Sequence, residues 1–158
     1  RELLDFSRKR QAPGRRGDYR YSDTGFVVLG LLAERLYGGQ FHEIVARELF
    51  APLGMEDSYY PGRSAPLRGP ARPLAPLRLG GAELSEAASL SADWAGGGAA
   101  ATLGDFQRLA TALGEGRVVS RDPLRLMAEP RNRFERGVHY GLGLMRLRFG
   151  EFFPLLSG

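Results

Sequence analysis

Two residues whose side chains could do chemistry stand two positions apart near the start of the chain, Tyr21 and Asp23. The residues that follow, 24–34, are predominantly apolar, so the pair lies in a loop that leads directly into a helix. A phenol can donate or accept a proton and a carboxylate can accept hydrogen bonds, and this spacing is typical of a catalytic tyrosine motif. The same residues also suit a simpler role, a helix cap beside a packed aromatic ring.

Other groups that commonly do chemistry are scarce. The only lysine is Lys9, and the residue three positions before it is Phe6, so these residues contain no Ser-x-x-Lys nucleophile motif. Zero cysteines exclude cysteine nucleophiles, disulfides and thiolate metal sites together. The two histidines, His42 and His139, are far apart and do not indicate a metal cluster. We therefore expect no cofactor, and the sequence indicates the middle of an enzyme.

Composition and charge narrow the class of protein further. Of the 22 basic residues in this chain of net charge +4, all but one are arginines, and acidic residues are interleaved with them. A nucleic-acid surface needs basic residues gathered on one face with stacking aromatic side chains between them. We therefore expect no nucleic-acid partner; a nucleic-acid module would instead show strongly salt-dependent binding. No apolar run approaches the roughly 20 residues of a membrane span, so none is expected.

Two amphipathic helices are predicted after the opening loop. Residues 25–37 carry apolar side chains at spacings of three and four, with Thr24 available as the cap and Gly38 as the stop. This segment is so apolar that we expect it to be buried on most sides. Residues 41–50 form the second helix, which Pro52 ends.

The rest of the helical region is interrupted by a long loop. Residues 61–81 are rich in proline, glycine and arginine, which predicts an extended surface loop held by its leucines lying on the body. Thr102 and Asp105 resemble a capping box at the start of a helix that ends near Gly114. A further short helix is predicted over residues 120–129.

A single strand is predicted near the end of the chain. Residues 140–149 alternate in polarity, with Met145, Leu147 and Phe149 on one face. No second strand is convincing, although an isolated strand is not stable, so we expect its partners outside this segment. The predicted fold class is α+β: one segment over residues 1–158, mostly helical to about residue 130, with a C-terminal strand of an antiparallel sheet.

The order of these motifs resembles that of the serine β-lactamase and D-alanyl-D-alanine carboxypeptidase superfamily, specifically its class C β-lactamase-like branch. The matches run in the family's order over nearly the whole chain. They are Pro13-Gly14 ahead of Tyr21-Ser22-Asp23, then Pro52-Leu53-Gly54-Met55, then Trp94-Ala95-Gly96-Gly97-Gly98 with the helix after it, and finally Tyr140-Gly141-Leu142-Gly143-Leu144.

The resemblance implies a serine hydrolase that forms an acyl-enzyme on an ester, a β-lactam or a D-amino-acid peptide bond. Such enzymes carry Ser-x-x-Lys, Tyr-x-Asn and Lys/His-x-Gly motifs, and only the second is present here, with Tyr21 as the implied proton shuttle. We expect the third just beyond Gly158, and we expect this chain alone to be inactive. The implied partner is a small-molecule or peptide substrate. The arginine bias is typical of a GC-rich bacterial genome, whereas the compartment (periplasmic, secreted or cytoplasmic) and the oligomeric state are not indicated.

The resemblance also implies roles for two further residues, Asp23 and Trp94. Asp23 stands where the family usually has asparagine, and a carboxylate can only accept hydrogen bonds, so it is expected to help position the lysine and the substrate. Trp94 is implied as a wall of the acyl pocket, and it could equally fill the core. The alternative to an enzyme is a homologue without catalysis, with a binding or regulatory role.

Overall fold

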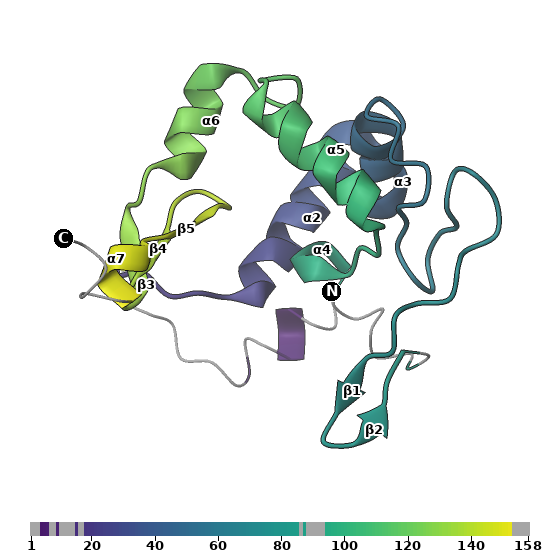
Figure 1. Ribbon diagram of the computed structural model, residues 1–158, viewed down its shortest axis with the longest axis horizontal. Helices are drawn as coiled ribbons and strands as arrows, with labels where there is room; N and C mark the ends of the chain where they lie inside the picture. The colour runs from purple at the N-terminus through teal and green to yellow at the C-terminus, as the bar shows by residue number, and fades with distance from the viewer. Residues whose placement is uncertain are drawn as a thin grey trace. The chain divides into compact units, whose positions relative to one another are not determined.

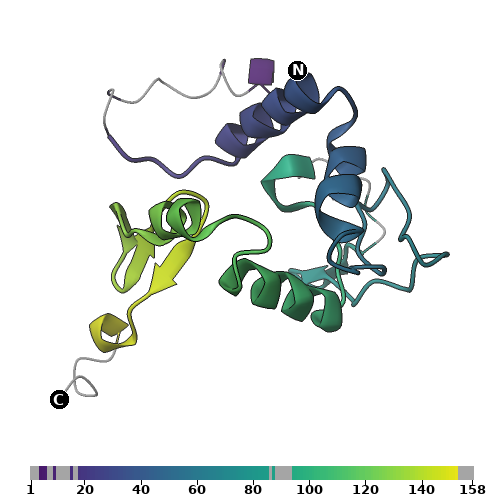
Figure 2. The ribbon, with the colours of Figure 1, turned by 90° about the horizontal axis from the view of Figure 1, so that it is seen from above.

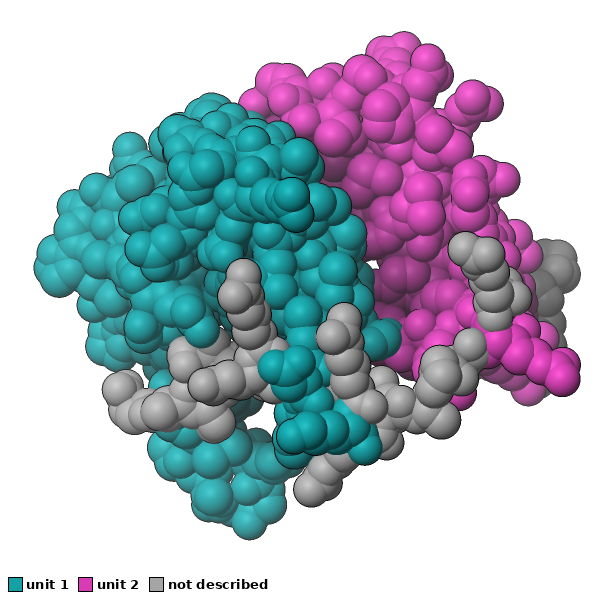
Figure 3. Space-filling view, turned by 180° about the vertical axis from the view of Figure 1, so that it is seen from behind, with its two compact units in different colours: residues 1–14, 22–111 teal, residues 15–21, 112–158 magenta. Residues whose placement is uncertain are grey.

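The computed structural model describes residues 4–6, 9, 15, 18–85, 87 and 94–152. The chain divides into two compact units: unit 1 comprises residues 1–14 and 22–111, and unit 2 comprises residues 15–21 and 112–158 (Figure 3). Among the described residues, no helix is long and apolar enough to cross a membrane.

Helix α2, Asp23–Tyr37, begins two residues before the predicted start (Figure 1). The prediction that Thr24 caps it is wrong, because Ser22 occupies the cap position with an extended backbone. At the other end Gly38 adopts a left-handed conformation, and its N–H donates to the carbonyl of Glu34 at 3.0 Å. Glycine adopts this conformation without a Cβ penalty, which explains why the helix stops as predicted.

The expectation that this helix is buried on most sides is also wrong. Only Val27 and Gly30 are buried, whereas Leu29 and Leu36 are 58% and 71% exposed. Within unit 1 the helix packs against α3 and α4 (Figures 1 and 2), and these cover one of its sides. Much of the remaining apolar stripe, including Val28 and Leu32, is left exposed.

The second predicted helix is present but changes its winding halfway. It consists of the α-helix α3, Phe41–Val45, and the π-helical turn η1, Ala46–Phe50, in which backbone hydrogen bonds are one residue longer. Phe50 then packs with Met55 and Tyr60 in the main apolar cluster of unit 1. Three aromatic and sulfur-containing side chains from one short stretch thus form the core around which the later loops fold.

The proline-rich loop over residues 61–81 has turns and extended backbone and ends in a small hairpin of β1, Arg78–Leu79, and β2, Ala82–Glu83. Its leucines do not hold it as predicted, since Leu67 and Leu79 are 51% and 73% exposed. A loop without a repeating period cannot place them on one face. Other contacts help to hold it: Pro66 is buried, and the guanidinium of Arg68 lies 2.7 Å from the Glu56 carboxylate.

Two further helices complete unit 1. The short helix α4, Trp94–Gly97, lies beside α2, and α5, Leu103–Gly114, continues across the boundary into unit 2. The predicted capping box is half right: Thr102 Oγ1 accepts a hydrogen bond from the N–H of Asp105 at 3.2 Å. The Asp105 carboxylate turns the other way, because it is buried and bonds to Ser58.

Unit 2 contains helix α6, Arg121–Ala128, close to the predicted bounds, followed by a three-stranded antiparallel sheet. The strands are β3, Asn132–Glu135; β4, Val138–Tyr140; and β5, Met145–Leu147, in the order β3-β4-β5. A short helix α7, Phe149–Phe152, ends the described chain.

The prediction of one long strand over residues 140–149 is therefore wrong in its extent. Tyr140 ends β4, and the chain turns through Gly141–Leu144 before β5, with Gly143 in a left-handed conformation. The glycines that appear to continue the alternation in fact make a hairpin. Strands β3 and β4 were missed because each is only three or four residues long and rich in polar side chains.

The sheet has an apolar face and a charged face. In the register, Asn132 pairs with Tyr140 and Tyr140 with Met145, while Arg133 pairs with His139 and His139 with Arg146. Directly paired residues point to the same face. Tyr140 and Met145 therefore share one face, and Arg133, His139 and Arg146 share the other.

Candidate active site

Tyr21 is held against the apolar face of the sheet in unit 2. Its ring meets the rings of Phe134 and Tyr140 edge-on, with both centroid distances 5.6 Å. Edge-to-face packing of this kind adds about 0.5–1.5 kcal/mol per pair beyond the buried area. Because the side chain is still 36% exposed, the ring is fixed while part of it remains accessible.

Tyr19, two residues earlier, packs on the same strand but differs in its hydroxyl. Its ring lies 6.0 Å from that of Tyr140, and its hydroxyl oxygen is buried without a hydrogen-bond partner among the described residues. Burial raises the pKa of the Tyr19 phenol, and the neighbouring Tyr140 raises it further. Tyr19 therefore stays neutral at ordinary pH and acts as a packing residue.

Asp23 is the first residue of α2 and is exposed. A carboxylate in the first turn of a helix interacts favourably with the backbone dipoles. The capping interpretation of the triplet is not supported, because the side chain of Ser22 makes no cap hydrogen bond. Helix α4 passes close to Asp23: a Cβ placed on Gly96 would lie 3.9 Å from the Asp23 Cβ and from its carbonyl oxygen.

Trp94, the first residue of α4, has a strained backbone with φ of 34°. For a bulky residue this left-handed conformation is uncommon and costs of the order of 1–3 kcal/mol. The indole compensates by packing: a Cβ on Gly30 of α2 would lie 3.0 Å from its Cη2 atom, and its ring meets that of Phe41 at 5.2 Å. The guanidinium of Arg63 also lies over the ring, 5.9 Å from the centroid.

The structure thus assigns each predicted site residue to a local setting. Asp23 and Trp94 both belong to unit 1, where α4 adjoins the start of α2, whereas Tyr21 belongs to unit 2. Sequence reasoning missed the two rings that hold Tyr21, Phe134 and Tyr140. A signal for one of them existed, since Tyr140 opens a Tyr-Gly-Leu-Gly motif, but the motif was interpreted as strand only.

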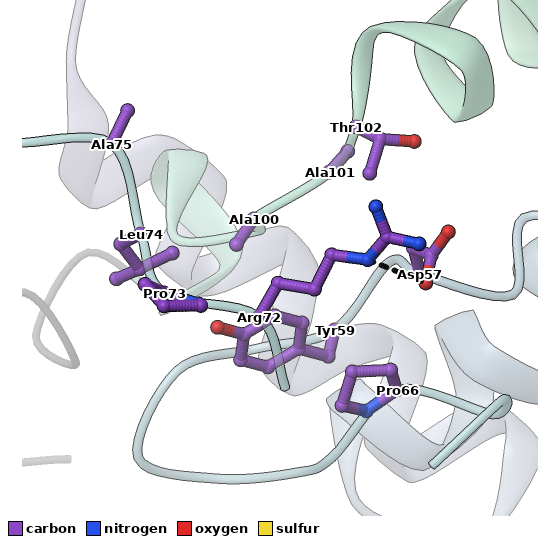
Figure 4. Close-up of a pocket in the computed structure, with 10 residues that line it drawn as sticks. All are labelled: Asp57, Tyr59, Pro66, Arg72, Pro73, Leu74, Ala75, Ala100, Ala101 and Thr102. Carbon is purple, nitrogen blue, oxygen red and sulfur yellow. Dashed lines mark ion pairs between the residues drawn. The ribbon is translucent and has the colours of Figure 1, made fainter. Parts of the chain in front are cut away.

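Unit 1 also has a cavity of about 100 Å³ between the loop that carries Arg72 and the segment before α5 (Figure 4). The Arg72 side chain lies across it toward Asp57, with 3.9 Å between Nε and Oδ1. A water molecule occupies roughly 30 Å³ of liquid, and ligand sites usually measure about 300–1,000 Å³. This cavity is therefore too small for a substrate. Among the described residues, no group of three or more histidine, aspartate or glutamate side chains could hold a metal ion.

Comparison with known proteins places this arrangement in context. The family model described as Beta-lactamase matches residues 1–151. The D-amino acid amidase from Ochrobactrum anthropi SV3, complexed with L-phenylalanine, is 26% identical with a TM-score of 0.79, covering 94% of this chain and 45% of that one. A penicillin binding protein from Bacillus halodurans is 25% identical with a TM-score of 0.66, covering 94% of this chain and 48% of that one.

A third similar structure acts on a D-configured substrate according to its name. The D-stereospecific amidohydrolase from Streptomyces sp. is 27% identical with a TM-score of 0.65, covering 82% of this chain and 39% of that one. The chain therefore spans less than half the length of each of these three proteins.

Proposed function

The chain belongs to the β-lactamase family, and from that premise we propose that it supplies the proton-transfer residue of a serine hydrolase that works through an acyl-enzyme. In the proposed reaction a serine oxygen bonds to the carbonyl carbon of an ester, β-lactam or D-amino-acid amide. The serine proton passes to Tyr21, which returns it to the leaving group as that bond breaks. Water then cleaves the acyl-enzyme and restores the serine.

The observation that carries the proposal is the way in which Tyr21 is held. Two aromatic rings fix its side chain from the sheet, and the side chain stays partly exposed. A general base must sit within hydrogen-bond reach of its proton, and a ring locked by its neighbours meets that need better than a mobile one. Tyr19 shows the contrasting case, a half-buried tyrosine whose hydroxyl oxygen is buried.

Position alone does not activate a tyrosine. Its ordinary pKa is about 10, so a value near 7 needs about 4 kcal/mol of preferential stabilisation of the phenolate. Aromatic rings supply no positive charge, and burial raises a phenol's pKa, so nearby cations must do this work. The family's lysine from Ser-x-x-Lys is absent from these residues. We therefore propose that this chain alone does not turn over substrate.

Asp23 points to the kind of substrate. As a carboxylate it accepts hydrogen bonds and attracts cations, whereas the family's usual asparagine could also donate to a substrate carbonyl. A substrate with a free ammonium group beside its scissile carbonyl suits this change. D-amino-acid amides carry such a group, and two of the similar structures are named for D-amino acid or D-stereospecific hydrolysis. Trp94, on the neighbouring helix α4, is the proposed wall for the substrate's side chain.

The test begins with the coding DNA on both sides of this segment. A Ser-x-x-Lys upstream and a Lys- or His-x-Gly after residue 158 are expected. The complete gene product is then assayed with D-phenylalaninamide, L-phenylalaninamide, a chromogenic cephalosporin and p-nitrophenyl acetate, and the acyl-enzyme is sought by intact-protein mass spectrometry. A flank that lacks the serine and lysine, or a complete protein that cleaves none of these compounds, would overturn the proposal.

The Asp23→Asn variant of the same complete protein tests the assignment of the ammonium contact. We expect the loss of kcat/KM to be larger for the amino-acid amide than for p-nitrophenyl acetate, which has no ammonium group, because a charge-assisted contact contributes about 1.5–3 kcal/mol. An equal loss on both substrates would mean that Asp23 acts on the catalytic groups and not on the substrate.

A second candidate function is favoured by one observation, the absence of Ser-x-x-Lys from these residues. A homologue that keeps the fold without the nucleophile would bind ligands or partners and not hydrolyse them. The flanking sequence separates the two candidates directly, since only the enzyme requires the serine and the lysine.

A further inference from the structure

An open cavity of about 500 Å³ lies within unit 2, outside the candidate active site. It is lined from two sides, by the last turn of α6 with the residues after it and by β5. The lining residues are Arg125, Leu126, Ala128, Glu129, Pro130 and Arg146. Its volume falls in the range of about 300–1,000 Å³ that is typical of small-molecule sites.

Neither of the two arginines in this lining is neutralised by an acidic side chain among the described residues. Arg125 and Arg146 form no hydrogen bond or ion pair through their side chains with any other described residue, whereas several other arginines do. The one acid in the lining, Glu129, is already bound: its carboxylate lies 3.1 Å from a guanidinium nitrogen of Arg131. The cavity therefore has two uncompensated positive charges.

The fold explains why the arginines meet there. Arg146 stands on the charged face of the sheet, directly opposite His139 in the register. The end of α6 is fixed to the hairpin between β4 and β5, since the N–H of Leu142 donates to the carbonyl of Met127 at 3.0 Å. A Cβ on Gly141 would collide with that same carbonyl oxygen, so the close approach depends on glycine. Arg125, half a turn earlier on α6, is thereby brought to the cavity that Arg146 lines.

The lining identifies the chemistry of a ligand. Guanidinium groups present a planar fork of donors that matches carboxylate or phosphate oxygens. Leu126, Ala128 and Pro130 supply an apolar wall beside the two charges. We propose that this cavity binds a small organic anion, with a carboxylate or phosphate group held by Arg125 and Arg146 and a compact apolar body packed on the wall. The site is separate from Tyr21 and does not depend on the proposed hydrolytic activity.

Binding of simple probes to the purified protein tests the proposal. The probes are benzoate, phenyl phosphate, inorganic phosphate and benzylamine, measured by isothermal titration calorimetry at constant ionic strength. Benzoate or phenyl phosphate is expected to bind, and benzylamine, which has the same ring with a positive charge, is not. Which of the two anions binds more tightly distinguishes a carboxylate ligand from a phosphate ligand.

Three charge-neutralising variants locate the binding. We expect Arg125→Gln and Arg146→Gln each to weaken the bound anion about tenfold or more, as the loss of a charged hydrogen bond does. Arg121→Gln is the matched control, because Arg121 lies on the same helix, has no ion pair with a described residue and does not line the cavity. It is expected to leave the affinity unchanged.

A measurement on the unaltered protein guards against variants that fail to fold. Phenylglyoxal modifies accessible arginines, and the bound anion is expected to protect Arg125 and Arg146 but not Arg121, as read by peptide mass spectrometry. The proposal is overturned if no organic anion binds, if benzylamine binds equally well, or if Arg121→Gln weakens binding as much as the other two. Equal affinity for inorganic phosphate and phenyl phosphate would remove the apolar part of the proposal.

Discussion

Each unit contains a carboxylate that fastens a loop to a neighbouring element, and the two are built alike. In unit 1, Asp105 accepts hydrogen bonds from the backbone N–H of Asp57 at 3.0 Å, the hydroxyl of Ser58 at 2.8 Å and the guanidinium of Arg108 at 2.8 Å. In this way the start of α5 is joined to the turn that follows the core residue Met55.

In unit 2, Glu151 also has three partners, with an imidazole in place of the hydroxyl. It accepts from the backbone N–H of Gly137 at 3.2 Å and from the guanidinium of Arg148 at 3.2 Å, and its carboxylate lies 3.0 Å from Nε2 of His139. Helix α7 is thereby fastened to β4, the strand that ends in Tyr140 and holds Tyr21.

The two carboxylates differ in their exposure to water. The Asp105 side chain is 1% exposed, whereas that of Glu151 is 33% exposed. When a buried carboxylate is removed, no water molecule can take its place as the acceptor for its donors. The donors of a more exposed carboxylate can bind water instead. The contacts of the carboxylate should therefore be strong in unit 1 and weak in unit 2. The strand that holds Tyr21 is the one with the weaker attachment.

The largest expected effect is that of Asp105→Ala. It leaves the buried Ser58 hydroxyl and the N–H of Asp57 without an acceptor, and each unsatisfied buried donor costs about 1–3 kcal/mol. We expect the free energy of unfolding to fall by about 3 kcal/mol or more in urea titrations. Asp105→Asn, which keeps one acceptor oxygen, should lose less. A loss below about 1 kcal/mol for the alanine variant would show that this carboxylate does not fasten unit 1.

Ser58→Ala is expected to have a smaller effect than Asp105→Ala. The variant removes one hydrogen bond but leaves the carboxylate with two other donors, so the loss should be about 1 kcal/mol by the same titration. Combined with Asp105→Ala, which removes the acceptor, it forms a double-mutant cycle in which contacting residues show non-additive losses. Strict additivity would contradict the direct hydrogen bond.

The smallest effect is expected at Glu151, and it depends on pH. Partial burial alone would raise the pKa of the Glu151 carboxyl, but hydrogen bonds from His139, Arg148 and the N–H of Gly137 outweigh it and lower that pKa. A lowered pKa in the folded state means that the contribution to stability is present above the unfolded-state pKa of about 4.3. It is lost as the pH falls through that value toward the folded-state pKa.

Amide hydrogen exchange across this pH range checks the prediction for Glu151. Protection of the Gly137 N–H, corrected for intrinsic exchange, should decrease on acidification in the wild-type protein but show no such step in Glu151→Gln. The stability of that variant at neutral pH should fall by less than that of Ser58→Ala. A larger loss than in Asp105→Ala would reverse the comparison between the two units.

A helix or strand could be predicted from the sequence where its own residues carry a clear pattern. Helix α2 was predicted because its apolar spacing is regular and a glycine ends it, and α6 was predicted within one residue at each end. The burial of α2 was wrong, since periodicity shows which face is apolar but not whether anything covers it. The sheet was underestimated because a hairpin through Gly143 mimics a continuing strand.

For the candidate site, the sequence identified the residues but not the contacts between them. Tyr21, Asp23 and Trp94 were selected from motif order, which carries residue identity but no contacts. The rings of Phe134 and Tyr140 around Tyr21 come from more than 100 residues further along the chain, and no local pattern encodes such a pairing. Of the contacts of Asp105, the one with Thr102 could be predicted because a capping box is a local pattern. The hydrogen bond from Ser58 could not, because Ser58 is distant in the sequence.

The most direct test of the central claim, that Tyr21 transfers protons in a serine hydrolase, is the kcat of Tyr21→Phe in the complete gene product. Tyr19→Phe is the matched control, because it removes a buried hydroxyl that has no partner among the described residues and keeps the same ring contact with Tyr140. We predict that Tyr21→Phe lowers kcat by about 10²–10⁴, the usual contribution of a general acid–base group, while Tyr19→Phe stays near wild type. Wild-type kcat in Tyr21→Phe, or an equal loss in both variants, would contradict the account.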